Sequence, residues 1–150
     1  MIEIIRTTSD NTDFRMLVTQ LDQDLQIRDG EEHAFYAQFN KSGSIKHAVV
    51  GYKDDTPAGS GALREYDADC AEIKRMFVKP EYRGKGIATS VLTELEVWAK
   101  ELNYRACILE TGKKQPEAIA LYQKAGYIVI PSYGQYKNIE NSVCMKKEFR

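Results

Sequence analysis

The sequence Val78-Lys-Pro-Glu-Tyr-Arg-Gly-Lys-Gly-Ile-Ala-Thr89 connects an apolar run at residues 73–78 to a long amphipathic segment. The run is typical of a strand, and the amphipathic segment is typical of a helix. The first N–H groups of a helix lack partners within it, its dipole adds roughly half a positive charge there, and glycine lets an anion approach closely. This stretch therefore predicts a strand, a turn and a helix that hold a phosphate-bearing ligand at residues 83–89.

The elements on both sides of this turn follow from hydrophobic periodicity and from turn residues. Helices are predicted at residues 12–27, 31–39, 85–102 and 116–124. Strands are predicted at residues 2–7, 46–52, 58–65, 70–78, 106–109, 127–130 and 142–149. The order β-α-α-β-β-β-α-β-α-β-β predicts a mixed α/β layer fold in one domain, residues 1–150. The strands before and after the long helix should run parallel, because a crossover connection joins them.

Local signals set several boundaries. We expect Ser9-Asp10 to cap the first helix, residues 54–57 to form a turn, and Asn103 to cap the long helix. Glycines at 59 and 61 mark a bulge or a close backbone approach.

Composition excludes several classes of protein. The 150 residues carry a formal net charge of -1, so no global basic field favours nucleic acid. No apolar run reaches membrane-spanning length, and the N-terminus lacks a signal peptide's basic start and apolar core. The three cysteines, 70, 107 and 144, form no metal-binding or disulfide pattern. We therefore expect a cytoplasmic protein with no metal site and no membrane partner.

Three kinds of phosphate site compete at the glycine turn. The string GxxxxGK[ST] of a nucleotide P-loop does not occur in the chain. Thr89 stands where the dinucleotide fingerprint GxGxxG needs its third glycine, and the turn follows an antiparallel meander. The basic residues around the turn, Lys74, Arg75, Lys79, Arg83 and Lys85, are by charge alone typical of a solvated face.

The third kind of site fits the residues better. Arg83-Gly-Lys-Gly-Ile-Ala88 resembles [Q/R]-x-x-G-x-[G/A], the pyrophosphate-binding signature of the GNAT superfamily of N-acetyltransferases. Residues 76–80 resemble that family's fourth strand, and Leu121-Tyr-Gln-Lys-Ala-Gly-Tyr127 resembles its second signature, L-Y-x-K-x-G-[F/Y]. The resemblance implies a mostly antiparallel mixed sheet with helices on both faces.

The resemblance also implies acetyl-CoA as co-substrate and a set of residues that bind it. Backbone groups near a bulge in the fourth strand would pair with pantetheine, and the glycine turn would hold the pyrophosphate. Gln115 stands where the family often has an asparagine, and Tyr122 would protonate the leaving thiolate as general acid. The implied contacts are Met76, Phe77, Val78, Arg83, Gly84, Lys85, Gly86, Ile87, Ala88, Thr89, Gln115 and Tyr122.

The general base and the acceptor stay open at this point. Glu110 ends a strand beside the expected cleft, and Glu72 lies on the strand that carries Met76; either carboxylate could take the amine's proton, Glu72 otherwise being a solvent-facing strand residue. Residues 26–36 and 132–136 are expected to recognise the acceptor, with Tyr133 and Tyr136 either walling a pocket or covering the sheet. Asp29, Glu31 and Glu32 would attract a cationic amine or form a solvated helix start.

The sequence therefore favours transfer of an acetyl group to a primary amine, with a small molecule favoured over a protein as acceptor. One alternative is a module that binds acyl-CoA without turnover, and another is a different nucleotide-binding protein. Exposed edge strands also predict a homodimer.

Overall fold

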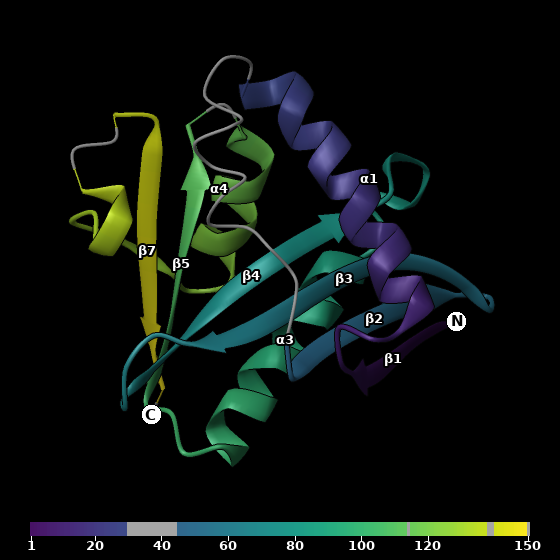
Figure 1. The fold of residues 1–150 in the computed structure, drawn as a ribbon, viewed down its shortest axis with the longest axis horizontal. Coiled ribbons are helices and arrows are strands. Elements are labelled where there is room, and N and C mark those ends of the chain that lie inside the picture. The colour runs from purple at the N-terminus through teal and green to yellow at the C-terminus, as the bar shows by residue number, and fades with distance from the viewer. Residues whose placement is uncertain (30–44, 114, 138–139, 150) are drawn as a thin grey trace.

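The computed structural model describes residues 1–29, 45–113, 115–137 and 140–149 (Figure 1). Its strands are β1 (Ile2–Thr7), β2 (His47–Lys53), β3 (Thr56–Glu65), β4 (Cys70–Val78), β5 (Ala106–Gly112), β6 (Ile128–Ile130) and β7 (Ser142–Glu148). Its helices are α1 (Thr12–Asp29), α3 (Ile87–Glu101) and α4 (Pro116–Lys124), with 3₁₀ turns η2 (Pro80–Tyr82) and η3 (Gly134–Tyr136). The helix predicted at residues 31–39 lies outside the described residues.

The seven strands form one sheet in the order β1-β2-β3-β4-β5-β7-β6. Every neighbouring pair of strands is antiparallel except β4 and β5, which are parallel. These two strands precede and follow α3 in the sequence. This confirms the parallel crossover expected around the long helix. The parallel pairing covers only Cys70–Glu72 against Ala106–Ile108, and Figure 1 shows β4 and β5 separating toward their C-terminal ends.

The helices cover both faces of the sheet, as the resemblance implied. In α1, Phe14, Leu17 and Leu21 pack against Ala48 and Val50 of β2. The residue between those two, Val49, packs on the opposite face against the layer built from α3 and α4. This follows from the period of two along a strand, which sends alternate side chains to opposite faces.

A bulge in β4 explains why β4 leaves β5. Opposite β3, the register passes from Phe77↔Ser60 to Lys74↔Ala62, so β4 carries one extra residue. Arg75 lies at this point with a φ of 57°, and its carbonyl accepts a hydrogen bond of 3.0 Å from the Ser60 hydroxyl. The facing Gly61 allows a close approach, because a Cβ there would lie 2.7 Å from both Leu95 Cδ1 and Met76 Sδ.

Two predicted boundaries were wrong for local reasons. The side chain of Asn11, rather than Ser9 or Asp10, caps α1: its Oδ1 accepts a 2.9 Å bond from Phe14 N. The turn predicted at residues 54–57 is shorter. Asp54 and Asp55, with φ of 49° and 68°, form a two-residue turn of the kind that matches strand twist, so β3 begins at Thr56. Asn103 stands at the end of the long helix as expected: it follows the C-cap residue Leu102, and its φ of 72° is the left-handed conformation that commonly ends a helix.

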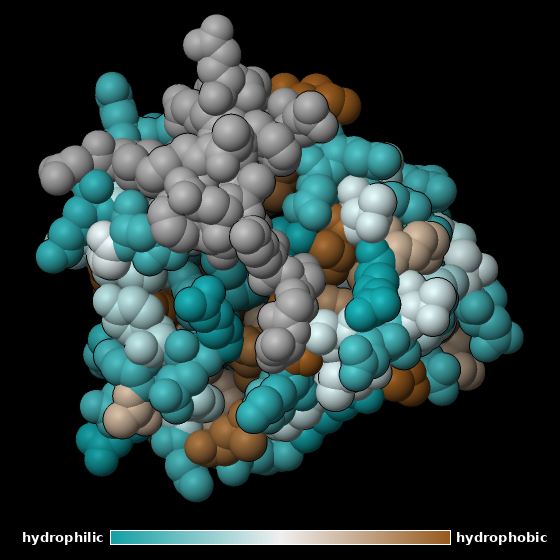
Figure 2. Space-filling view, in the orientation of Figure 1, coloured by the Kyte–Doolittle hydropathy of each residue, from teal (hydrophilic) through white to brown (hydrophobic). Residues whose placement is uncertain are grey.

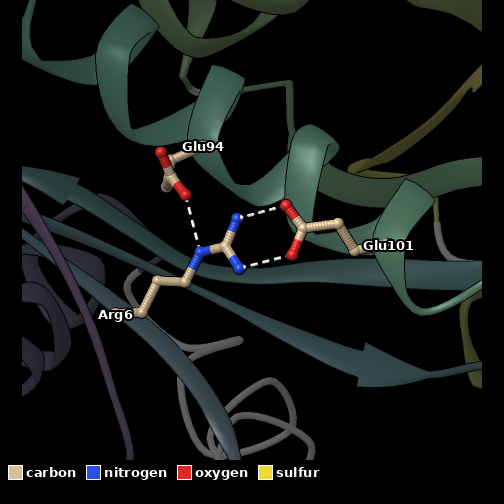
Figure 3. A network of polar contacts seen from close by, with 3 residues as sticks. All are labelled: Arg6, Glu94 and Glu101. Atoms are coloured by element: carbon tan, nitrogen blue, oxygen red, sulfur yellow. Dashed lines mark hydrogen bonds and ion pairs between the residues drawn. The ribbon is translucent and has the colours of Figure 1, made fainter.

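One ion cluster joins the first strand to α3. Arg6 donates from Nε to Glu94 at 2.6 Å and from both terminal nitrogens to Glu101 at 2.7 and 2.9 Å (Figure 3). Its guanidinium also lies 4.8 Å from the centre of the Trp98 ring. The three α3 residues share one helix face because they are four and three residues apart in sequence.

We expect Arg6→Met to lower the free energy of unfolding by about 1 kcal/mol, since partly exposed ion pairs and cation–π contacts each contribute only fractions of a kcal/mol. Methionine retains most of the aliphatic part of the arginine side chain, so the loss of stability measures the contribution of the charged guanidinium. Urea unfolding at low and high salt measures the free energy of unfolding of both proteins. The difference between wild type and Arg6→Met should shrink at high salt, because salt screens the ion pairs. Arg105→Met is the control: its contact with Asp69 is 3.7 Å long and both side chains are mostly exposed, so its effect should be near zero. Equal losses in the two variants would contradict the assignment.

The face seen in the space-filling view is mainly hydrophilic, with smaller apolar areas between the polar side chains (Figure 2). In the described ranges, no helix is long and apolar enough to cross a membrane.

Candidate active site

A pocket of about 300 Å³ lies where β4, the glycine turn and α4 meet. Eleven of the twelve predicted cofactor contacts line it: Met76, Phe77, Val78, Arg83, Gly84, Gly86, Ile87, Ala88, Thr89, Gln115 and Tyr122. The twelfth, Lys85, is exposed in the same turn but is not part of the lining. The sequence motifs, which are distant along the chain, thus converge on one cavity.

The backbone of the turn explains its two glycines. Gly84 and Gly86 have φ of 77° and 83°, in the left-handed region that other residues enter at a cost. A Cβ built at either position would meet no atom of the described residues within 4 Å, so packing among these residues does not require glycine there. The left-handed backbone conformation is what requires glycine at these two positions, and among the described residues the space beside the turn is open.

The start of α3 presents amide groups to this space. The first helical hydrogen bond runs from Ser90 N to Gly86 O at 3.0 Å. The amides of Ile87, Ala88 and Thr89 precede that bond, and amides in such positions seek partners outside the helix. Together with the dipole of a 15-residue helix, they favour an anion at this end.

Arg83 folds back toward β4. Its Nε donates a 3.0 Å hydrogen bond to the carbonyl of Val78, and its guanidinium lies 5.9 Å from the centre of the Phe77 ring. In this structure the carbonyl of Val78 is therefore bound by the protein's own side chain. A ligand that pairs with that carbonyl would have to displace Arg83.

A second, smaller pocket of about 100 Å³ occupies the gap between the diverging ends of β4 and β5. It shares five lining residues with the larger one: Leu21, Met76, Gln115, Ala118 and Tyr122. The charged residues Lys74, Arg75 and Glu110 are also among those that line it. The two pockets adjoin, with Tyr122 in the wall of both.

Tyr122 is held firmly between them. It is 6% exposed, and its ring contacts Tyr127 edge to face with centroids 5.8 Å apart. Burial, and secondarily the negative charge of Glu110, raise the pKa of the Tyr122 hydroxyl well above its usual value. The hydroxyl therefore stays protonated at ordinary pH, a state in which it can donate a proton.

The two candidate carboxylates have different surroundings. Glu110, near the end of β5, is half-buried and lines the smaller pocket. Glu72 lines neither pocket. It is 4% exposed and accepts a 2.8 Å hydrogen bond from the Tyr133 hydroxyl, so the alternative reading of Glu72 as a solvent-facing residue is wrong. The structure brings Glu110, and not Glu72, into the same cavity as Tyr122.

The tyrosine-rich segment covers the sheet. Tyr133 and Tyr136 are 9% and 1% exposed and pack on Cys70, Ile108 and Cys144. The other segment expected to recognise an acceptor spans residues 26–36. Its residues 30–36, which include Glu31 and Glu32, lie outside the described part of the chain, as does the side chain of Asp29. In the parts of the chain that the structure describes, no group of three or more His, Cys, Asp or Glu side chains is arranged to hold a metal ion.

Sequence reasoning missed Lys74 and Arg75 as pocket residues. Both belong to the basic run around the turn, whose charge is typical of a solvated face, yet Arg75 is buried and both line the smaller pocket. Burial lowers the pKa of Lys74, although Glu72 and Glu110 act in the opposite direction. The glycines at 59 and 61 on the facing strand β3 were the one sequence signal for this part of the pocket. They indicated a bulge but did not show that its extra residue lies in β4 near Arg75.

Comparisons with known proteins agree with this geometry. A model of the acetyltransferase (GNAT) family matches residues 13–127. An IAA acetyltransferase of Azospirillum brasilense is 35% identical over 100 residues, which cover 66% of this chain and 65% of that protein. The match thus spans slightly less than two thirds of this curated relative.

Solved structures share the whole architecture. A Klebsiella pneumoniae protein assigned as an acyl-CoA N-acyltransferase superposes with a TM-score of 0.81 at 25% identity, over 99% of this chain and 97% of that one. The PaiA N-acetyltransferase of Thermoplasma acidophilum, solved with coenzyme A, gives 0.73 at 21% identity over 99% of each chain, which shows a shared fold. The chain belongs to the GNAT family of acetyltransferases.

Proposed function

We propose that this protein transfers the acetyl group of acetyl-CoA to a primary amine by direct attack within a ternary complex. The observation that carries the proposal is the pair of adjoining pockets, one containing the glycine turn and one containing Glu110, with Tyr122 in the wall of both. Family membership supports it, as does the coenzyme A bound to a protein of the same fold.

The larger pocket would take the donor. The amides of residues 87–89 and the turn at Gly84 and Gly86 would hold the pyrophosphate. The bulged end of β4 would pair with the pantetheine amides, which requires Arg83 to release the Val78 carbonyl. The acetyl group would then lie beside Tyr122, facing the smaller pocket.

The smaller pocket would take the acceptor. Glu110 would accept a proton from the ammonium, directly or through water, and the freed amine would attack the thioester carbonyl. As the carbon–nitrogen bond forms and the carbon–sulfur bond breaks, the Tyr122 hydroxyl would donate its proton to the leaving thiolate. The nitrogen would then lose its second proton to the Tyr122 oxygen, directly or through water, which leaves a neutral amide and restores the hydroxyl. General acid–base help of this kind contributes ~10²–10⁴-fold.

Release of free CoA from acetyl-CoA tests the proposal, assayed with a panel of small amines and followed by mass spectrometry of the acceptor. Release that depends on the amine, with acetylated amine as product, is the expected result. Tight CoA binding with no release for any amine would instead favour the non-catalytic sensor.

We expect Glu110→Gln to remove the acidic limb of the pH profile of kcat/KM, because glutamine cannot take up the amine's proton. Glu72→Gln is the matched comparison on the neighbouring strand and should keep that limb, since Glu72 hydrogen-bonds Tyr133 away from both pockets. A Glu110→Gln profile that keeps the wild-type acidic limb would remove Glu110 as the base.

Location and assembly form part of the same proposal. Free, buried Cys70, Cys107 and Cys144 suit a reducing cytoplasm. The edge strand β6 exposes Ile128 and Val129, which favours contact with a second copy.

A further inference from the structure

We infer that the acceptor carries a carboxylate beside its amine, as an α-amino acid does, and that Arg75 and Lys74 bind this carboxylate in the smaller pocket. The inference rests on the proposed function and adds the substrate class. It starts from an unusual placement of charge along β4.

In a regular strand, successive side chains point to opposite faces of the sheet. Lys74 and Arg75 are successive, yet both line the same pocket. The bulge makes this possible, because the φ of 57° at Arg75 turns that residue out of the regular alternation. The backbone distortion thus brings two basic residues to one wall, where Lys74 Nζ donates a 3.3 Å hydrogen bond to the Tyr136 hydroxyl.

Arg75 is fixed in place by contacts on both sides. Its side chain is 3% exposed, and its Nη2 donates a 2.9 Å bond to Asp22 of α1. Its carbonyl is held by the Ser60 hydroxyl. Only the Arg75 end of this pair is buried, since the Asp22 side chain is 49% exposed. A positive φ at a non-glycine residue costs roughly 1–2 kcal/mol. A ligand-binding role gives this costly arrangement a reason, since a planar guanidinium binds carboxylates in a defined geometry.

The opposite wall has the opposite sign. Glu110 comes from β5, across the gap from the β4 cations, and it suits an ammonium group. A molecule with an ammonium toward Glu110 and a carboxylate toward Arg75 and Lys74 would match both walls. A polyamine would place a second positive charge against Arg75 and Lys74, which is unfavourable in a poorly solvated pocket. The volume of about 100 Å³ fits such a small group.

The test uses the common L-amino acids, each paired with its carboxamide, as acceptors for the 150-residue protein with acetyl-CoA. For the preferred side chain, kcat/KM should be at least about tenfold higher for the acid than for the amide, a difference that one charged contact supplies. Arg75→Met should reduce this ratio to about twofold or less. Arg105→Met, at an exposed arginine outside both pockets, should keep the wild-type ratio.

Two further variants keep the test decisive if Arg75→Met does not fold. Lys74→Met should also lower the acid-to-amide ratio. Arg75→Lys, which keeps the charge but loses the planar fork, should give a ratio between those of wild type and Arg75→Met. Equal rates for acids and amides in the wild type would overturn the inference while leaving acetyl transfer intact, as would a preference for polyamines or for lysine side chains of peptides. Absence of product with every amine would overturn the proposed function itself.

Discussion

Replacing Tyr122 with phenylalanine should lower kcat at least about tenfold and leave the KM for acetyl-CoA almost unchanged. The ring is buried between the two pockets, so phenylalanine keeps the packing and removes only the hydroxyl. Without that proton donor, the thiolate leaves unprotonated and the transition state loses more stabilisation than the bound donor does. Steady-state kinetics with the best acceptor measures both constants.

Tyr127→Phe is the matched control for this effect. Tyr127 is also buried and touches the Tyr122 ring, but its hydroxyl donates to Glu96 at 2.9 Å and it lines neither pocket. Its loss should lower stability by about 1–3 kcal/mol, since Glu96 is deprived of a buried partner, and should change kcat by less than about twofold. Turnover of Tyr122→Phe at the wild-type rate would remove Tyr122 as the acid.

Gly86→Ala should weaken the binding of CoA by about tenfold or more. Its φ of 83° strains any residue with a Cβ, and the added methyl group would enter the open space in front of α3, where we place the pyrophosphate. Calorimetric titration of CoA gives the affinity, and urea unfolding gives the cost of the backbone strain.

Gly134→Ala separates these two causes. Gly134 also has a positive φ, 53°, and a Cβ there would meet only Tyr66, at 4.0 Å, among the described residues. It lies outside both pockets. We expect comparable losses of stability of roughly 1–2 kcal/mol in the two variants and an unchanged CoA affinity in Gly134→Ala alone. Equal CoA affinities for wild type and Gly86→Ala would contradict the pyrophosphate assignment.

Most of the helices and strands could be predicted from the sequence, because turn and capping residues agreed with the hydrophobic periodicity. The bounds of β1 and β4 and the start of α4 at Pro116 were predicted to the residue. A β-branched run marks β1, the turn at residues 67–69 and Pro80 bound β4, and a proline in the first helical turn marks α4. The residues lining the larger pocket were predicted from short motifs, whose spacing places them on adjoining elements.

The features that set the smaller pocket depend on tertiary contacts. The bulge at Arg75 needs Ser60 and Gly61 on the facing strand, and the burial of Arg75 needs Asp22 on α1. The burial of Glu72 depends on Tyr133, far along the chain. None of these partners is close to its target in sequence. Charge alone therefore suggested a solvated face for Arg75, and the sequence left Glu72 open between a general base and a solvent-facing residue.

Direct titration tests the central claim that the glycine turn binds the pyrophosphate of CoA. CoA, ATP and NAD would each be titrated into the wild-type protein under identical conditions. We predict one CoA site per chain and tighter binding of CoA than of the two other nucleotides. Tighter binding of ATP or NAD would contradict the account and identify the turn as a different nucleotide site.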